Sequence, residues 1–293
     1  MNVSSVRHAV VIGTGLVGTS IALALRNAGV HVGLHDRDDD AVAMAVELGA
    51  GVAAGPEDPP ADVVVIATPP STVVGVLCEA QACGLGAVYT DVASTKERIV
   101  ADVERAGADL ASYVPGHPIA GGELSGPTGA RADLFVGRPW ALCPSQATSL
   151  AAVLGVIELV KACRAVPKTL PPDAHDRVLA LVSHVPHVVS AVLAARFADA
   201  DAGTLSWVGK GLRDTTRIAA GDPDLWCDIL RHNAPAVAEE LESVLLDMAD
   251  AVRALRMTTG TGPPRAAGLV ELLAKGNQGR DNIVSPQEHR RAA

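Results

Sequence analysis

A histidine within a glycine-rich stretch is the residue of this chain best suited to chemistry. His117 lies in residues 116–126, GHPIAGGELSG, whose composition is typical of a loop. The stretch separates an N-terminal half with alternating strand and helix patterns from a C-terminal half with helical patterns. A histidine at such a junction can face a cofactor and a second ligand together, which is where a hydride transfer needs an acid or a base.

The N-terminal residues carry the pattern of a dinucleotide site. A short apolar run ends at Gly13, Gly15 and Gly18, in the arrangement G-x-G-x-x-G, and a helix-forming segment follows. Gly13 permits the tight turn, Gly15 lets the backbone approach a pyrophosphate, and Gly18 lets the helix pack on the strand. The first helical turn, with Leu16 and Val17, offers unpaired N–H groups to the phosphates. An ordinary glycine turn is the alternative, but the surrounding strand and helix patterns favour a dinucleotide.

The residue that ends the second apolar run bears on the choice of cofactor. Asp36 follows residues 30–35. Its separation from Gly18 along the chain is close to the ~20 residues at which an acidic side chain meets the ribose hydroxyls of a dinucleotide. A carboxylate there repels a 2′-phosphate, which favours NAD over NADP. Arg37 argues the other way if it holds that phosphate, and is otherwise a solvated turn residue. Thr68, after a third apolar run, is a candidate cofactor contact or a simple turn residue before two prolines.

Charge and composition exclude several classes of protein. The chain has 24 Lys and Arg against 33 Asp and Glu, a formal net charge of −9 and only 2% aromatic residues, so nucleic acid is not an expected partner. The five cysteines form no C-x-x-C pair, which indicates a reduced cytoplasmic protein without a metal site. No signal segment is evident, and we expect no apolar run near the roughly 18 residues that a membrane span needs.

The patterns predict two domains in the 293 residues. Residues 1–171 are expected to form an α/β Rossmann-type domain, and residues 172–293 an all-α domain with a mobile polar tail. Within the second, Pro186 is expected to kink a long apolar helix, with His184 and His187 on one face. These histidines belong either to a pocket wall or to the core.

Three further patterns have ordinary structural explanations as well. Ser94, followed three residues later by Glu97, predicts a capping box, although its hydroxyl can also face a substrate. Asp214 and Arg217 can form a surface i,i+3 pair. Apolar residues from 237 to 255 recur at steps of three and four, which predicts a helix packed on another helix of the same chain or of a second copy.

Five segments together resemble the prephenate/arogenate dehydrogenase family of tyrosine biosynthesis. Their order and spacing fit from about Val6 to Arg280. The segments are GTGLVG at 13–18, DVASTK at 91–96, HPIAG at 117–121 with Ser125 and Gly126, SHVPH at 183–187, and RDTTRIA at 213–219.

The resemblance implies an NAD(P)-dependent oxidative decarboxylation of a dianionic cyclohexadienol. In that family the histidine matching His117 binds the ring hydroxyl and helps to remove its proton. The serine matching Ser94 assists at the hydroxyl, and the arginine matching Arg217 holds a substrate carboxylate. Three further residues are implied to line or support the pocket: Glu123, His187 and Asp214.

The expected protein is thus a homodimeric prephenate dehydrogenase with NAD as cofactor. Arogenate and 4-amino-4-deoxyprephenate remain alternative substrates. A hydroxyacid dehydrogenase is a more distant alternative that needs a catalytic lysine, for which Lys210 is the nearby candidate, and a non-catalytic NAD-sensing module is another. Because the chain ends soon after Arg280, a C-terminal regulatory domain is not expected.

Overall fold

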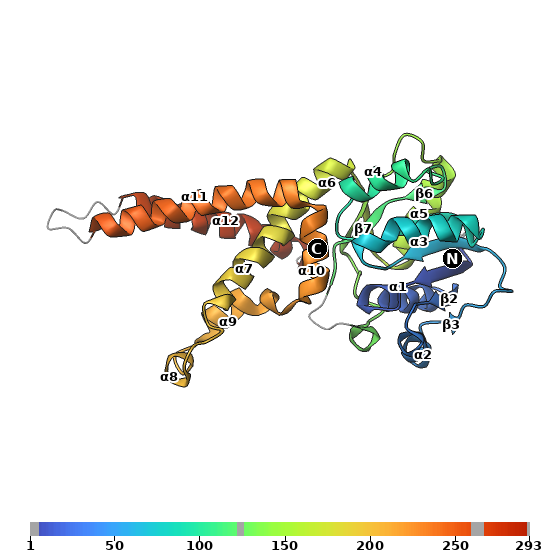
Figure 1. The fold of residues 1–293 in the computed structure, drawn as a ribbon, viewed down its shortest axis with the longest axis horizontal. Coiled ribbons are helices and arrows are strands. Elements are labelled where there is room, and N and C mark those ends of the chain that lie inside the picture. The colour runs from blue at the N-terminus through green and yellow to red at the C-terminus, as the bar shows by residue number, and fades with distance from the viewer. Residues whose placement is uncertain (1–5, 122–125, 259–266, 292–293) are drawn as a thin grey trace. The chain divides into compact units, whose positions relative to one another are not determined.

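The computed structural model describes residues 6–121, 126–258 and 267–291 (Figure 1). The chain forms two compact units, Met1–Val237 and Ala238–Ala293. The first contains two sheets and the helices that cover them. The second contains most of α11 (Ala234–Thr258) and α12 (Ala267–Arg291).

The main sheet has six parallel strands in the order β3-β2-β1-β4-β5-β6. Its central strands β1 and β4 are rich in Val and Ile and are buried along most of their length, as in parallel sheets covered by helices. Because β1 pairs with both β2 and β4, the strand order reverses there, and ligands of such sheets bind at that switch point. The strands are β1 His8–Ile12, β2 His31–His35, β3 Val52–Ala53, β4 Ala61–Ile66, β5 Gly86–Asp91 and β6 Tyr113–Val114.

Helices cover both faces of this sheet (Figure 1). Apolar residues of α1 (Leu16–Asn27), α2 (Asp39–Glu47) and α5 (Leu150–Ala162) belong to one buried cluster. Those of α3 (Val73–Ala82) and α4 (Glu97–Arg105) belong to a second cluster. The predicted Rossmann-type α/β arrangement is confirmed.

A second sheet positions the first residues of the glycine-rich stretch. It consists of β7 (Gly116–Pro118), β8 (Pro139–Leu142) and β9 (Val166–Thr169), with β7 antiparallel and β9 parallel to β8. The loop prediction was therefore wrong for residues 116–118, because pairing with β8 makes them a strand. A Cβ on Gly116 would lie 2.7 Å from the carbonyl oxygen of Asp91, so only glycine lets β7 run this close to β5.

The predicted long apolar helix is interrupted by a π-helical turn. It runs as α6 (Pro172–Leu179), the π-helical segment η3 (Ala180–His184) and α7 (Val185–Ala195). Pro186, which has no N–H, lies in the first turn of α7, directly after the widened turn. Residues 172–195 are the one helix of the described residues long and apolar enough to cross a membrane by length and composition. The expectation that no apolar segment approaches this length was wrong, although core helices of soluble proteins also reach this length and composition.

The remaining secondary-structure elements of the described chain are helical. They are α8 (Ala202–Leu205), α9 (Lys210–Thr216), the 3-10 turn η4 (Arg217–Ala220), α10 (Pro223–His232), α11 and α12, with two further 3-10 turns, η1 (Pro70–Thr72) and η2 (Pro127–Gly129). The polar segment predicted as a mobile tail continues α12 as a helix to Arg291, although it has no apolar stripe. The predicted domain boundary after residue 171 falls at the start of α6, inside the first unit, and stays a prediction.

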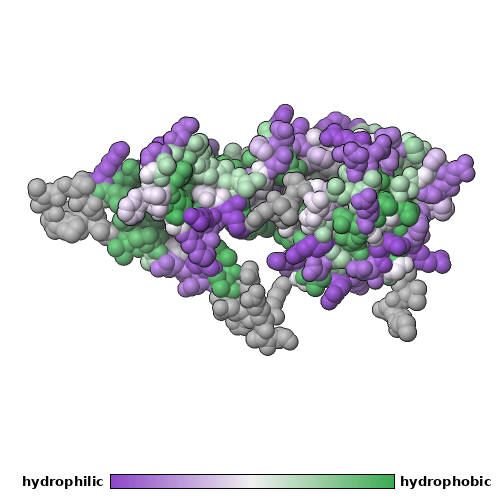
Figure 2. All heavy atoms as spheres, turned by 90° about the horizontal axis from the view of Figure 1, so that it is seen from below, coloured by the Kyte–Doolittle hydropathy of each residue, from purple (hydrophilic) through white to green (hydrophobic). Residues whose placement is uncertain are grey.

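The predicted seam of α11 is buried at its start and exposed further along. Val237 is buried, whereas Met248, Val252 and Leu255 are exposed. Figure 2 shows apolar patches reaching the surface among hydrophilic side chains. All five cysteines are free, and two of them, Cys143 and Cys163, are buried.

Candidate active site

The glycine turn at the end of β1 has the geometry of a phosphate-binding site. Gly13 has φ +102°, and a Cβ there would lie 2.4 Å from the carbonyl oxygen of Ala67. A Cβ on Gly18 would lie 1.9 Å from the carbonyl oxygen of Gly13, so both glycines are needed for packing. Gly15 has no described atom within 4 Å of its Cβ position, and no side chain of the described residues caps α1. An anionic pyrophosphate fits against this open turn and the free N–H groups of the first helical turn.

Asp36 lies beside this turn, at the end of β2. Its Oδ2 accepts hydrogen bonds from N (2.6 Å) and Oγ1 (3.0 Å) of Thr14, and its Oδ1 accepts from N of Asp38 (3.1 Å). Partial burial raises the pKa of Asp36, but these hydrogen bonds outweigh it and leave the pKa below the ordinary 3.8. The carboxylate is therefore ionised at the position predicted for the ribose contact, while Arg37 is exposed.

The other predicted cofactor contacts flank the same edge of the sheet. Leu16 and Val17 begin α1, directly after the glycine turn, and their side chains pack partly against the core. Thr68 follows β4 next to Ala67, and its Oγ1 accepts a hydrogen bond from Thr72 Oγ1 (2.9 Å). Their contacts with a cofactor stay predictions.

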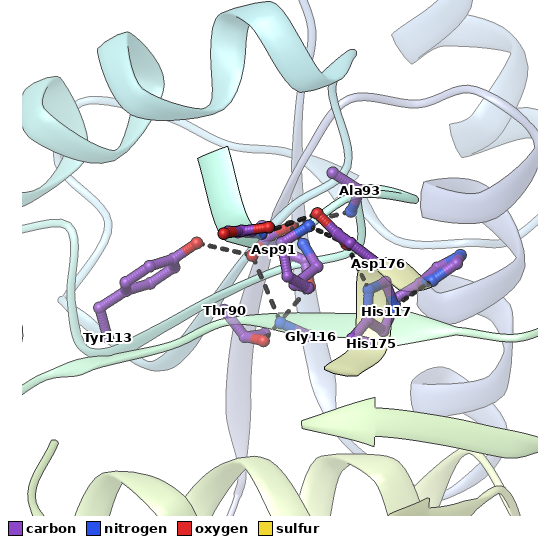
Figure 3. Close-up of polar contacts among 10 residues, drawn as sticks. Thr90, Asp91, Ala93, Tyr113, Gly116, His117, His175 and Asp176 are labelled. Atoms are coloured by element: carbon purple, nitrogen blue, oxygen red, sulfur yellow. Dashed lines mark hydrogen bonds and ion pairs between the residues drawn. The ribbon is translucent and has the colours of Figure 1, made fainter. Parts of the chain in front are cut away.

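His117 lies on β7, opposite Ala141 of β8, and its side chain is buried (Figure 3). Its Nδ1 is 2.9 Å from Nε2 of His175, and Nδ1 of His175 is 2.7 Å from Oδ1 of Asp176. Burial lowers the pKa of His117 well below 6.5, and the charges of its neighbours, among them Lys96, act in the same direction. The imidazole is therefore neutral near pH 7 and ready to accept a proton.

Asp176 also forms the cap of α4. Its Oδ1 accepts from N of Lys96 (2.8 Å) and its Oδ2 from N of Glu97 (2.9 Å). The helix begins at Glu97 with Lys96 at the N-cap, and no side chain of that cap is used. The capping-box prediction for Ser94 was therefore wrong, because a carboxylate from α6 does the capping. Ser94 lies partly exposed in the turn between β5 and α4.

A buried ion pair fixes the same strand end. Lys96 Nζ contacts Oδ1 of Asp91, and both side chains are fully buried. Oδ2 of Asp91 accepts from the hydroxyl of Tyr113 (2.6 Å) and from N of Gly116 (3.3 Å). Burial, aided by the Asp91 charge, raises the pKa of Tyr113 well above 10, so the phenol stays a donor. Asp91 thereby ties β5 to β6 and to the residue before His117 (Figure 3).

A cavity of about 630 Å³ lies along α7 and η4. Its lining includes Ser183, Pro186, His187, Arg217, Gly221 and Trp226. The ring of His187 stacks on Trp226 at 3.5 Å between centroids and an interplanar angle of 9°. A Cβ on Gly221 would lie 2.3 Å from Trp226 Nε1, so glycine is required beside the stacked rings. This cavity combines an aromatic wall with a guanidinium.

His184 links the cavity wall to the group around His117. Its Nδ1 is 3.1 Å from Nδ2 of Asn233, and the same Nδ2 donates to the carbonyl oxygen of Asp176 (2.7 Å). The ring also packs edge-on against Trp226, with centroids 6.2 Å apart. Burial lowers the pKa of His184 to about 4. His184 and His187 lie on one face as predicted, because both rings contact Trp226.

Asp214, a predicted pocket residue, is not among the described residues that line the cavity. Asp214 is exposed and pairs with Lys210, with Nζ to Oδ2 at 2.5 Å. Lys210, exposed in this pair, gains no support as a catalytic lysine. Glu123 lies outside the described residues.

Sequence patterns did not single out several residues of the site. Four of them make its central contacts: His175, Asp176, Trp226 and Asn233. The adjacent His and Asp just after two prolines were a usable signal for the first two, since a His–Asp pair at a helix start suits proton chemistry. Trp226 and Asn233 had no local signal, because their partners are distant in sequence.

Residues 21–168 match the family described as "Prephenate dehydrogenase, nucleotide-binding domain", and residues 171–274 match "Prephenate dehydrogenase, dimerization domain". The chain belongs to the prephenate dehydrogenase family. It is 40% identical to the "Probable prephenate dehydrogenase NovF" of Streptomyces niveus, over 94% of this chain and 77% of that protein. It is 30% identical to the "Cyclohexadienyl dehydrogenase" of Zymomonas mobilis subsp. mobilis, over 83% of this chain and 86% of that protein.

The fold is similar to that of solved members of the family. A crystal structure of prephenate dehydrogenase from A. aeolicus, in complex with hydroxyphenyl propionate and NAD+, superimposes with a TM-score of 0.83 at 27% identity. The match covers 95% of this chain and 99% of that chain. The predicted family, the fold class and the assignment as an oxidoreductase are confirmed.

Proposed function

We propose that this protein is an NAD-dependent prephenate dehydrogenase that converts prephenate to 4-hydroxyphenylpyruvate and carbon dioxide. The observation that carries the proposal is His117, a buried histidine with a lowered pKa at the family motif HPIAG. The proposal draws further support from the relative whose structure holds NAD+ and hydroxyphenyl propionate.

The glycine turn and Asp36 are the residues that would hold NAD. The open face of Gly15 and the uncapped start of α1 suit the pyrophosphate, and Asp36 suits the ribose hydroxyls. Ionised Asp36 opposes a 2′-phosphate, whereas the exposed Arg37 leaves room for NADP. When bound there, NAD supplies the acceptor for the hydride of the ring carbon that carries the hydroxyl.

His117 acts on the proton of that hydroxyl. It accepts the proton as the carbon–oxygen double bond forms, with Ser94 assisting at the oxygen. The bond to the ring carboxylate then breaks, carbon dioxide leaves, and the electron pair makes the ring aromatic. His117 returns the proton to the phenolate oxygen, so no external base is consumed. The lowered pKa keeps the imidazole neutral before each cycle.

Arg217 is proposed to anchor a carboxylate of the dianionic substrate. It lines the cavity from η4, which packs against α7, and Ser190 Oγ ties α7 to the carbonyl oxygen of Thr215 (2.9 Å). A guanidinium is always charged and binds a carboxylate at two points. Because the chain has a net charge of −9, an anionic substrate needs such a local positive group to bind. The stacked His187 and Trp226 form the apolar wall beside it. Substrate contacts of Glu123 and Asp214 stay predictions.

Arogenate is the second candidate substrate, and 4-amino-4-deoxyprephenate the third. Arogenate stays a candidate substrate because one relative is named cyclohexadienyl dehydrogenase, a name that covers more than one ring compound. We further propose a cytoplasmic homodimer formed through the helical residues 172–293. The exposed apolar residues of α11 and the family description "dimerization domain" support this interface.

Replacement of His117 by asparagine tests the proposal. His117→Asn is expected to abolish turnover of prephenate while leaving the Kd for NAD unchanged, since the residue removes a proton and does not hold the cofactor. NADH absorbance measures the turnover, and calorimetric titration measures the Kd for NAD. Full turnover in the variant would refute the role as base, and loss of NAD binding as well would assign His117 a structural role. A chain that binds NAD but oxidises none of the three substrates would be the NAD-sensing module.

A further inference from the structure

The carboxylate of Asp176 lies among donors. It accepts two backbone N–H groups at the start of α4, from Lys96 (2.8 Å) and Glu97 (2.9 Å), and lies 2.7 Å from Nδ1 of His175. The side chain is 2% exposed. Backbone donors at a helix N-terminus stabilise the ionised form of a carboxylate, and an ionised carboxylate can only accept. The Asp176 carboxylate therefore accepts a hydrogen bond from Nδ1 of its histidine neighbour.

This arrangement fixes the protons of both histidines. Because Asp176 accepts, Nδ1 of His175 carries a hydrogen, and the Nε2 of a neutral imidazole is then an acceptor. That Nε2 lies 2.9 Å from Nδ1 of His117, which must therefore donate. His117 is left with its lone pair at Nε2. The chain of contacts leaves one orientation of protons from His117 to Asp176 (Figure 3).

We propose that His175 is a positioning residue that holds His117 in the tautomer with a basic Nε2 and connects it to the Asp176 carboxylate. When His117 accepts the hydroxyl proton, its Nδ1–H donates to His175, and the charge is stabilised by the anion beyond it. The inference rests on the proposed function, in which His117 is the base. The two residues that it assigns, His175 and Asp176, lie outside the five segments that resemble the family.

The remaining charged groups around His117 do not replace this anion. Lys96, whose charge lowers the pKa of His117, is a cation and is paired with Asp91, both fully buried. Burial, the main cause, raises the pKa of the Cys143 thiol to about 12, so that group carries no charge near pH 7. Burial lowers the pKa of His184 to about 4, so it is neutral as well. Asp176 is the unneutralised anion that His117 reaches, through His175.

Two substitutions of His175 test the positioning role, with His232→Gln as a matched control. His175→Gln places an amide oxygen as acceptor near the former Nε2 but does not connect His117 to Asp176, whereas His175→Ala removes the acceptor as well. His232 also pairs with an aspartate, with Nδ1 3.2 Å from Oδ1 of Asp228, but lies outside the site. The full-length enzymes are compared in kcat, in KM for NAD and prephenate, and in the pH profile of kcat/KM. Urea unfolding and NAD titration verify that each variant folds.

We expect kcat to fall about 10²-fold or more in His175→Ala and to recover at least about tenfold in His175→Gln, with KM for NAD unchanged. The acid limb of kcat/KM should move to lower pH in His175→Gln, because His117 loses the anion that stabilises its cation. Movement to higher pH would mean that His175 is itself a cation that repels His117, and would overturn the proposal. Equal losses in the Gln and Ala variants, or a loss as large in His232→Gln, would overturn it too.

A measurement on the unmodified enzyme separates this inference from the proposed function. In ¹⁵N-histidine NMR spectra the resonance of His117 should show a protonated Nδ1 and an unprotonated Nε2. A His117 protonated at Nε2 instead of Nδ1 refutes the positioning role of His175 whether or not prephenate is oxidised. If the tautomer is as expected but no candidate substrate is turned over, the proposed function fails while the arrangement of protons stands.

Discussion

The buried His184 should make the fold sensitive to acid. The side chain is 1% exposed, and burial lowers its pKa to about 4, against about 6.5 in an unfolded chain. Between these values the unfolded chain binds a proton that the folded chain does not, so the free energy of unfolding falls as the pH falls from about 6.5 to about 4. The difference between the two pKa values corresponds to about 3 kcal/mol, and the stability is fully present above about pH 6.5.

Urea unfolding at several pH values between 7 and 4 measures this effect. His184→Asn keeps an acceptor near the former Nδ1 for Asn233 but carries no titratable group. The variant should be less stable than the wild type at pH 7, and that gap should shrink by about 3 kcal/mol at pH 4. His117 and His187 contribute equally to both proteins and cancel. His31→Asn, at an exposed position, is the control. A gap between wild type and His184→Asn that is constant with pH would refute the reasoning.

Three further predictions follow from contacts in the first unit. Asp91→Asn should lower the free energy of unfolding by about 3–5 kcal/mol in urea titrations, because it leaves Lys96 buried and unpaired; a loss below 1 kcal/mol would contradict the buried pair. Gly15→Ala should keep its melting temperature but bind NAD more weakly, whereas Gly18→Ala should melt earlier, because its Cβ meets backbone; equal melting losses would contradict this distinction. Arg217→Ala should raise KM for prephenate, with a loss of about 2–5 kcal/mol in kcat/KM, and spare KM for NAD. Equal effects on both KM values would remove the anchor role.

The sequence predicts the central strands of the main sheet because β1 and β4 are apolar runs rich in Val and Ile with clear ends. The glycine turn and Asp36 were also predictable, since each requires one residue type at one spacing. The strand β7 was not, because GHP has no strand pattern and becomes a strand only by pairing with β8. Similarly, the helix α12 runs through a polar segment without an apolar stripe.

Long-range contacts explain what sequence patterns missed in the site. His117 was found from its glycine-rich surroundings, but its partner His175 is 58 residues away. Ser94 and Glu97 had the spacing of a capping box, yet the cap comes from Asp176, separated from Lys96 by 80 residues. A local pattern shows which groups are able to make a contact, and packing decides between the local partner and a distant one.

The most direct test of the central claim is the formation of NADH by the purified full-length protein. The assay supplies NAD or NADP with prephenate, arogenate or 4-amino-4-deoxyprephenate in turn. We predict that NAD with prephenate gives the highest kcat/KM, with one NADH and one carbon dioxide formed per 4-hydroxyphenylpyruvate. No NADH from prephenate, under conditions in which arogenate or the amino compound is oxidised, would contradict the proposed substrate. No NADH from any of the three would contradict the proposed enzyme.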